Sequence, residues 1–189
     1  MLLWEQIKLM VEKDEIGYFY RSEESKLKYY KLKEKCQKEG ITLYQNLVVH
    51  SLNWYTHKEG VPLGKNGLPD DKDIIVKELN PTLFADPSDY KFLVNEYGYD
   101  FPKNLIHLCL WFKNFMVPDP KSDVGDISIE TKHVIERGLQ NLLEPVGVKR
   151  DQYVWFKNWA ALQSIRLLSH VHVVIVDLTS EQLAQILAL

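Results

Sequence analysis

The sequence has few of the residues that mark several common protein classes. It contains only two cysteines in 189 residues, Cys36 and Cys109, and they form no CxxC pair. Two thiols cannot build a zinc site alone, and small secreted domains normally carry more cysteines to form disulfides. The sequence therefore favours two unpaired thiols, no structural metal or other cofactor, and a cytoplasmic location, with the nucleus as an alternative.

Long apolar runs are also missing. The longest apolar stretch, Val171–Val176, is interrupted by a histidine and is far shorter than the roughly 20 residues of a membrane-spanning helix. The first apolar residues are broken up by Glu5, Gln6 and Lys8, so they form no signal-peptide core. We therefore expect a protein that neither spans nor binds a membrane.

An excess of positive charge is absent as well. The chain has 23 Lys and Arg against 26 Asp and Glu, for a formal net charge of −3. A nucleic-acid partner is disfavoured, because binding to phosphates requires a basic surface. The lysines at positions 26–38 alternate with acidic residues such as Glu34, which is typical of a solvated helix face.

The composition, with 46% hydrophobic and 12% aromatic residues, predicts a single domain over 1–189. Residues 1–56 form a helical segment, in which apolar spacing and capping signals predict helices at 2–13, 23–39 and 42–55. Residues 57–89 are rich in Gly and Pro and are expected to form a loop-rich connection.

Residues 90–189 predict a sheet with helices packed on it. Runs of β-branched and aromatic residues indicate strands near 90–95, 105–112, 152–157 and 170–176, and helices are expected at 128–143, 159–168 and 180–188. The connection of about nine residues between the first two strands is too short for a parallel crossover. The expected class is therefore α+β, with a mostly antiparallel sheet in the C-terminal half and a three-helix segment before it.

Two histidines, His170 and His172, lie in the last predicted strand. Alternation places them on one face, roughly 6.5–7 Å apart, where burial is costly unless their nitrogens are hydrogen-bonded or used. This pattern fits phosphate or metal binding, or nucleophilic catalysis; it fits structural histidines near a strand end equally well. A third, His107, shares a face with Cys109 and Trp111, and a lone histidine in an apolar strand is more often structural.

If these two strands are neighbours, the three histidines converge on one pocket. The tetrapeptide Trp-Phe-Lys-Asn also occurs twice, at 111–114 and 155–158, each time at a predicted strand end. We expect its rings in the core and its Lys and Asn at solvent or a ligand. Lys157 and Asn158 could hold a phosphate or a sugar hydroxyl; the alternative is a turn asparagine beside a solvated lysine.

Several stretches resemble the fungal N-acetylglucosamine-induced protein family, which is built on a domain of unknown function. The resemblance implies a cytoplasmic fungal protein connected with amino-sugar metabolism, and it supplies no catalytic mechanism. It covers most of the chain and rests on the tyrosine-rich opening 27–54, Phe92-Leu93-Val94-Asn95, His107-Leu108-Cys109-Leu110-Trp111-Phe112-Lys113, Trp155-Phe156-Lys157-Asn158, Leu162-Gln163-Ser164-Ile165 and His170-Val171-His172-Val173.

A more distant resemblance is to the histidine-triad nucleotide hydrolases and transferases. It implies that His172 attacks a nucleotide α-phosphate while His170 supports that phosphate. Val174 stands where the third histidine belongs, and Ser164 is further from the histidines than usual, which puts activity in doubt. The resemblance rests on the order of His107, the helix 128–143, Asn158, Gln163-Ser164 and His170-x-His172.

The resulting hypothesis is a small domain that binds a phosphorylated sugar or a nucleotide-sugar. Its enzymatic version adds phosphoryl or nucleotidyl transfer or hydrolysis through His172. The alternative is a regulatory or ribosome-associated protein-interaction module, in which aromatic residues and the Lys-rich helix dock a partner. The expected site consists of His107, Lys157, Asn158, Gln163, Ser164, His170 and His172.

Overall fold

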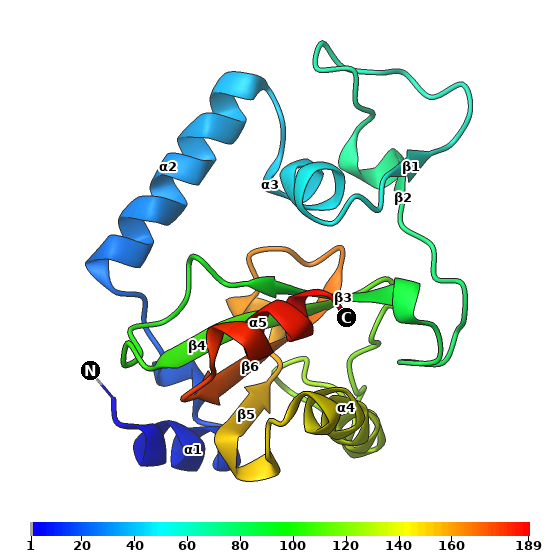
Figure 1. The fold of residues 1–189 in the computed structure, drawn as a ribbon. Coiled ribbons are helices and arrows are strands. Elements are labelled where there is room, and N and C mark those ends of the chain that lie inside the picture. The colour runs from blue at the N-terminus through cyan, green and yellow to red at the C-terminus, as the bar shows by residue number, and fades with distance from the viewer. Residues whose placement is uncertain (1) are drawn as a thin grey trace.

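The computed structural model describes residues 2–189 and contains a four-stranded antiparallel sheet (Figure 1). The strand order is β3-β4-β6-β5, and every neighbouring pair is antiparallel. All four strands lie where the sequence predicts them, so the α+β class is confirmed. Their bounds are Tyr90–Val94 for β3, Leu105–Phe112 for β4, Tyr153–Phe156 for β5 and Ser169–Val176 for β6.

Strands β4 and β6 are the two central strands, which explains why both are apolar on either face. Their register pairs Cys109 with His172 and Trp111 with His170. Directly opposed residues point to the same side of a sheet. The histidines predicted from alternation therefore share one face.

The opposite face is covered by α4 (Ile129–Leu143) and α5 (Ser180–Leu187). Both helices begin at the predicted caps, since Ser128 and Thr179 accept hydrogen bonds from backbone N–H groups of the first turn, which would otherwise have no partner. This layer holds the largest cluster of buried apolar side chains, including Phe92, Leu110 and Phe112.

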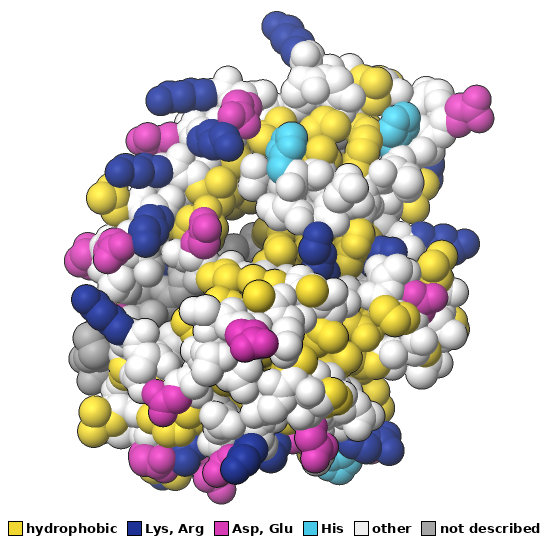
Figure 2. All heavy atoms as spheres, viewed as in Figure 1, with side chains coloured by type: hydrophobic (Ala, Val, Ile, Leu, Met, Phe, Trp, Pro, Cys, Tyr) yellow, Lys and Arg dark blue, Asp and Glu magenta, His cyan; other side chains and the backbone are white. Residues whose placement is uncertain are grey.

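The N-terminal part of the chain covers the histidine-bearing face. Its helices α2 (Glu23–Glu39) and α3 (Leu43–Gln45) lie over this face (Figure 1). Helix α1 (Trp4–Glu12) packs beside β5. Ser22 caps α2, and Gly40 ends it with a φ of 68°. Lysine side chains, interspersed with acidic ones, project along the outer edge of α2 (Figure 2), as predicted for a solvated helix face.

Two predicted helices have wrong bounds. The helix expected to run to residue 55 begins correctly, but it becomes a π-helix at Asn46–Ser51 and ends there. The helix expected at 159–168 is only a 3₁₀ turn, Ala160–Leu162, because Ile165 and Leu168 are drawn into the apolar cluster beneath α3, and tertiary packing overrides helix propensity. The loop-rich connection contains a small antiparallel pair, β1 (Thr56–His57) and β2 (Ile74–Ile75).

Two further expectations can be compared with the structure. Cys36 and Cys109 are buried free thiols on different elements. Among the described residues, no helix has the length and apolar character needed to cross a bilayer. Further 3₁₀ turns lie at Ile16–Tyr18, Asp71–Asp73, Pro87–Asp89, Glu144–Val146 and Arg150–Gln152.

Candidate functional site

A cavity of about 190 Å³ lies between the histidine-bearing face of the sheet and the α2–α3 layer. The sheet, both helices, the turn after β3 and the segment after β5 all contribute to its wall, so residues far apart in sequence meet here. The polar part of the wall is formed by Arg21, Asn46, Ser51, Asn95, Asn158, Ser164, His170 and His172, and the rings are those of Tyr29, Tyr97 and Trp111.

Two of the predicted histidines are hydrogen-bonded to each other across the central strands. His107 Nε2 and His172 Nδ1 are 2.9 Å apart, and the Cys109 Sγ lies 3.6 Å from the same His172 nitrogen. The His172 ring also stacks on Phe156, with 5.0 Å between ring centroids. His172 lines the cavity, whereas His107 lies behind it and does not.

The third histidine, His170, lies further along β6 and also lines the cavity. Its ring stacks on Trp111 with 4.1 Å between centroids, and it meets His172 edge-on at 5.2 Å. The three histidines are thus brought together on one face, two in the wall and one supporting them.

All three histidines are neutral at neutral pH. Burial lowers the pKa of His107 to about 3 and that of His170 to about 4, and it lowers the pKa of His172 well below 6.5. Removal from water disfavours the charged imidazolium. The histidines therefore offer hydrogen-bond donors and acceptors to a ligand, and they offer no positive charge.

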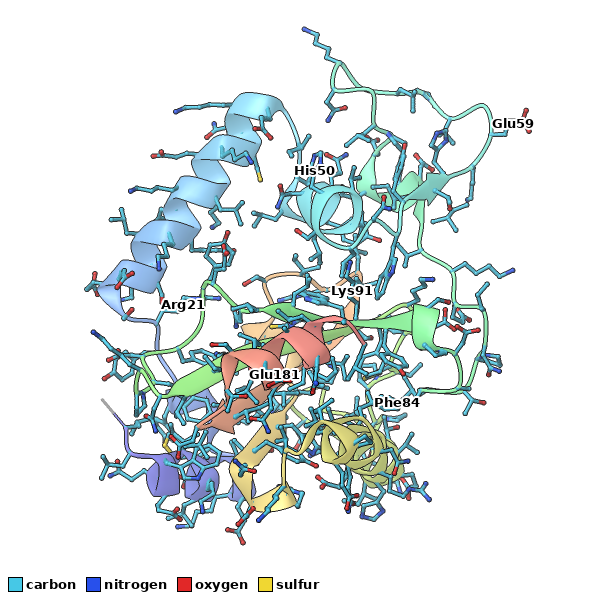
Figure 3. All side chains as sticks on the ribbon, in the orientation of Figure 1. Arg21, His50, Glu59, Phe84, Lys91 and Glu181 are labelled. Atoms are coloured by element: carbon cyan, nitrogen blue, oxygen red, sulfur yellow. The ribbon has the colours of Figure 1, made fainter. Side chains whose placement is uncertain are left out.

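Positive charge comes from Arg21, a residue that the sequence analysis missed. Its Nε donates to the Tyr97 carbonyl at 2.8 Å, and its guanidinium lies 4.9 Å from the Tyr29 ring centroid. Within residues 2–189, no carboxylate lies at ion-pair distance from it. Figure 3 shows it at the foot of α2, beside the space that separates this helix from the sheet.

Two asparagines contribute amide groups. Asn158, a predicted site residue, lines the cavity and exchanges hydrogen bonds with the Tyr99 hydroxyl at 3.0 and 3.2 Å. Asn95 was not predicted as a site residue; its Nδ2 lies 3.3 Å from His107 Nε2. Its position at the end of a predicted strand was the available signal.

Of the remaining predicted site residues, one lines the cavity and two do not. Ser164 lines the cavity, but Lys157 and Gln163 do not. Gln163 instead donates to the Asn158 carbonyl at 2.7 Å and so supports the turn. Lys157 is buried, and burial lowers its pKa.

The repeated tetrapeptide behaves differently from the prediction. Its Lys and Asn do not end the strands at solvent: Lys157 and Asn158 are buried, and so is Asn114. Lys113 lies 3.5 Å from the buried Asp89 carboxylate. The two asparagines find different partners: Asn114 Nδ2 donates to the Asn80 carbonyl at 2.8 Å, whereas the Asn158 amide bonds to the Tyr99 hydroxyl.

Among the described residues, no three His, Cys, Asp or Glu side chains are placed to hold a metal ion. The fold and the cavity define an α+β protein with a histidine-lined cavity between its sheet and a layer of N-terminal helices. The chain belongs to the family described as a protein of unknown function, DUF3605, whose model matches residues 3–176.

Two curated relatives are similar over nearly the whole chain. N-acetylglucosamine-induced protein 1 of Candida albicans is 33% identical over 174 residues, which cover 92% of this chain and 68% of the relative. The uncharacterized protein YPL067C of Saccharomyces cerevisiae is 26% identical, covering 91% and 77%. The predicted resemblance to the N-acetylglucosamine-induced proteins is confirmed.

A solved structure, described as the crystal structure of HTC1, has the same fold. Its TM-score is 0.62 at 24% identity, with 98% of this chain and 92% of that chain covered. The resemblance to histidine-triad proteins gains no support from any of these matches. It rests on a sequence pattern in which Val174, opposite His107 in the sheet, stands in the third histidine position.

Proposed function

We propose that the cavity binds a phosphorylated monosaccharide of the amino-sugar class. The observation that carries the proposal is the composition of the wall: stacked rings and amide side chains around one arginine that has no carboxylate partner among the described residues. Aromatic rings can cover the apolar face of a sugar, and a few convergent polar groups can read its hydroxyls.

Size favours a sugar phosphate over a nucleotide-sugar. The cavity measures about 190 Å³, whereas pockets for drug-sized ligands occupy ~300–1,000 Å³. A monosaccharide fits this scale better than a sugar joined to a nucleotide. The name of the Candida relative, an N-acetylglucosamine-induced protein, supports the amino-sugar class.

The charge of the cavity wall supports a phosphate position near Arg21. It is the one charged side chain among the described residues that line the cavity, and its guanidinium can form paired hydrogen bonds to phosphate oxygens. The neutral histidines do not compete for the anion. Binding is therefore proposed in preference to phosphoryl transfer through His172, which would require the phosphate to lie against a neutral imidazole instead of the guanidinium.

A thermal-shift series tests the proposal with N-acetylglucosamine 6-phosphate, glucosamine 6-phosphate, N-acetylglucosamine, UDP-N-acetylglucosamine and inorganic phosphate. A sugar phosphate at 100 times its Kd adds about 2.7 kcal/mol to the folded state, which corresponds to a rise in Tm of roughly 5–10 °C. Arg21→Gln should remove most of this rise and Arg21→Lys should retain part of it.

The matched control is Lys31→Gln, which removes a charge from the exposed face of α2 and should leave the rise unchanged. Equal shifts with inorganic phosphate and with the sugar phosphate would contradict a sugar site. No shift with any compound would contradict the proposal as a whole.

The second candidate is docking of a protein partner. Tyr18 and Tyr30 are 75% and 60% exposed beside the lysines of α2. Exposed aromatic rings of this kind are characteristic of interfaces. A Tyr18→Ser, Tyr30→Ser double variant should keep any sugar-dependent stabilisation and lose retention of a partner in affinity capture.

A further inference from the structure

The inference concerns a chain of hydrogen bonds that runs from the turn after β3 to the wall of the cavity. We propose that Asn95, acting through His107, holds the proton of His172 on Nδ1 and leaves Nε2 as a bare acceptor, so that this wall selects a ligand hydroxyl or amide N–H and rejects a phosphate oxygen. The identity of the ligand rests on the proposed function; the protonation pattern does not.

The chain starts at a group whose direction is fixed. The backbone N–H of Tyr97 can only donate, and it lies 3.2 Å from Asn95 Oδ1. The amide oxygen of Asn95 is thereby committed to Tyr97 as an acceptor. The Asn95 Nδ2, which can only donate, is left facing His107 Nε2 at 3.3 Å.

The donor and acceptor roles at Asn95 fix those of His107 and, through it, those of His172. Because Asn95 donates to it, His107 Nε2 must carry a lone pair, and a neutral imidazole carries its proton on the other nitrogen. His107 is neutral, since burial lowers its pKa to about 3. The single lone pair of His107 Nε2 is then shared between two donors, Asn95 Nδ2–H at 3.3 Å and His172 Nδ1–H at the shorter 2.9 Å contact.

The other neighbours do not reverse this assignment. Burial raises the pKa of Cys109 to about 12, so it remains a thiol, and its Sγ at 3.6 Å is a weak partner for His172 in either role. His107 Nδ1 lacks a partner among the described residues in both orientations. It faces Gly98, where an added Cβ would lie 2.8 Å from it.

The remaining nitrogen is the one that a ligand can use. His172 Nε2 is buried and has no hydrogen-bond partner among the described residues, although His172 lines the cavity. Such a lone pair is satisfied by an O–H or N–H donor and is repelled by an ionised phosphate oxygen, which only accepts. A phosphorylated sugar is thus oriented with a hydroxyl or acetamido N–H at His172 and its phosphate at Arg21.

The tautomer can be measured directly in the ligand-free wild-type protein. Two-bond ¹H–¹⁵N correlation spectra of the histidine rings should show His172 and His107 protonated on Nδ1 and bare on Nε2. The variant Asn95→Asp replaces the amide donor that faces His107 with an acceptor of the same shape. It should reverse both histidines, so that His172 becomes protonated on Nε2.

Binding provides the second readout. With N-acetylglucosamine 6-phosphate as the probe, Asn95→Asp should weaken affinity by at least about tenfold, because a donor now meets a donor. The control Asn141→Asp adds the same charge on the exposed side of α4 and should change neither the spectra nor the affinity.

Two spectroscopic results would overturn the inference: a His172 protonated on Nε2 in the wild type, or a His172 tautomer unchanged in a folded Asn95→Asp. The wild-type spectrum is decisive even if the variant does not fold. If the tautomers are as stated and no sugar phosphate binds, the proposed function fails while the role of Asn95 stands.

Discussion

At the scale of single residues, the buried histidine pair depends on a close backbone approach. Gly98 has no side chain, and a Cβ there would lie 2.8 Å from His107 Nδ1 and 3.2 Å from the Asn95 carbonyl oxygen. Both neighbours belong to the hydrogen-bond chain that ends at His172. A substitution at Gly98 therefore affects His172 indirectly, through His107, although Gly98 does not line the cavity.

Gly98→Ala should destabilise the fold by about 1–3 kcal/mol, the usual range for overpacking, and should shift the ring resonances of His107. Urea unfolding and histidine NMR measure the two effects. Gly17→Ala is the matched control, because its Cβ would meet Trp159 at an ordinary 3.4 Å. Equal stability of the two variants would show that the turn after β3 can move away from His107 at little cost.

Only some of the site residues could be predicted from the sequence. Alternation along one strand placed His170 and His172 on one face, and His107 joins them because its strand is the neighbour of theirs, which the prediction required as a condition. Arg21 was missed because it reaches the cavity from the segment before α2, outside the predicted strands, and Asn95 because a polar residue at a strand end carries no specific signal. Lys157 was expected at the ligand, but it is buried without lining the cavity, since spacing gives no information on which loop covers a strand end.

At the scale of elements, helix α4 is held against the sheet by a contact that only glycine permits. The ring of Phe84 lies where a Cβ of Gly138 would be, with three ring atoms at 2.3–2.5 Å from that position. The same ring packs edge-on against Phe112, with 5.1 Å between centroids. Figure 3 labels Phe84 beside α4, in the layer between helix and sheet.

Gly138→Ala should therefore destabilise the protein, although alanine favours a helix over glycine by about 1 kcal/mol. The clash should exceed that gain and leave a net loss of about 1–3 kcal/mol. The double variant Gly138→Ala, Phe84→Ala should be less costly than the sum of the two single changes, because the clash is then absent. Strict additivity in urea unfolding would rule out the contact.

Most elements could be predicted because their signals are local. Ser22, Ser128 and Thr179 cap helices at the expected positions, and β4 and β6 are long apolar runs of strand-forming residues. The helix expected at 159–168 failed because its apolar residues serve the cluster under α3, a demand that its own spacing does not reveal. The pair β1–β2 was missed because two-residue strands carry no periodicity.

At the scale of the whole molecule, three buried neutral histidines make the fold sensitive to acid. An unfolded histidine titrates near pH 6.5, whereas in the folded chain the pKa of His107 is lowered to about 3 and that of His170 to about 4. Between these limits the unfolded chain binds more protons. The stability that neutral histidines contribute is therefore fully present above pH 6.5 and is lost as the pH falls toward 4.

Each such histidine should reduce the free energy of unfolding by up to about 1.4 kcal/mol per pH unit in that window. Urea titrations at pH 7.5, 6 and 5 measure the slope. His170→Gln should make the slope shallower, and His133→Gln, which changes an exposed position on α4, should leave it unchanged. A free energy that stays constant from pH 7.5 to 5 would contradict burial of neutral histidines.

The π-helix at Asn46–Ser51 makes the length of this stretch matter as much as its composition. Leu52 donates to the Leu47 carbonyl five residues back, at 2.9 Å, so the turn holds one residue more than an α-helix would. Loss of that residue would restore α geometry and rotate everything beyond it by about 100°, carrying Ser51 away from the cavity wall. Family members one residue shorter should show their alignment gap here, together with a different set of side chains on this side of the cavity.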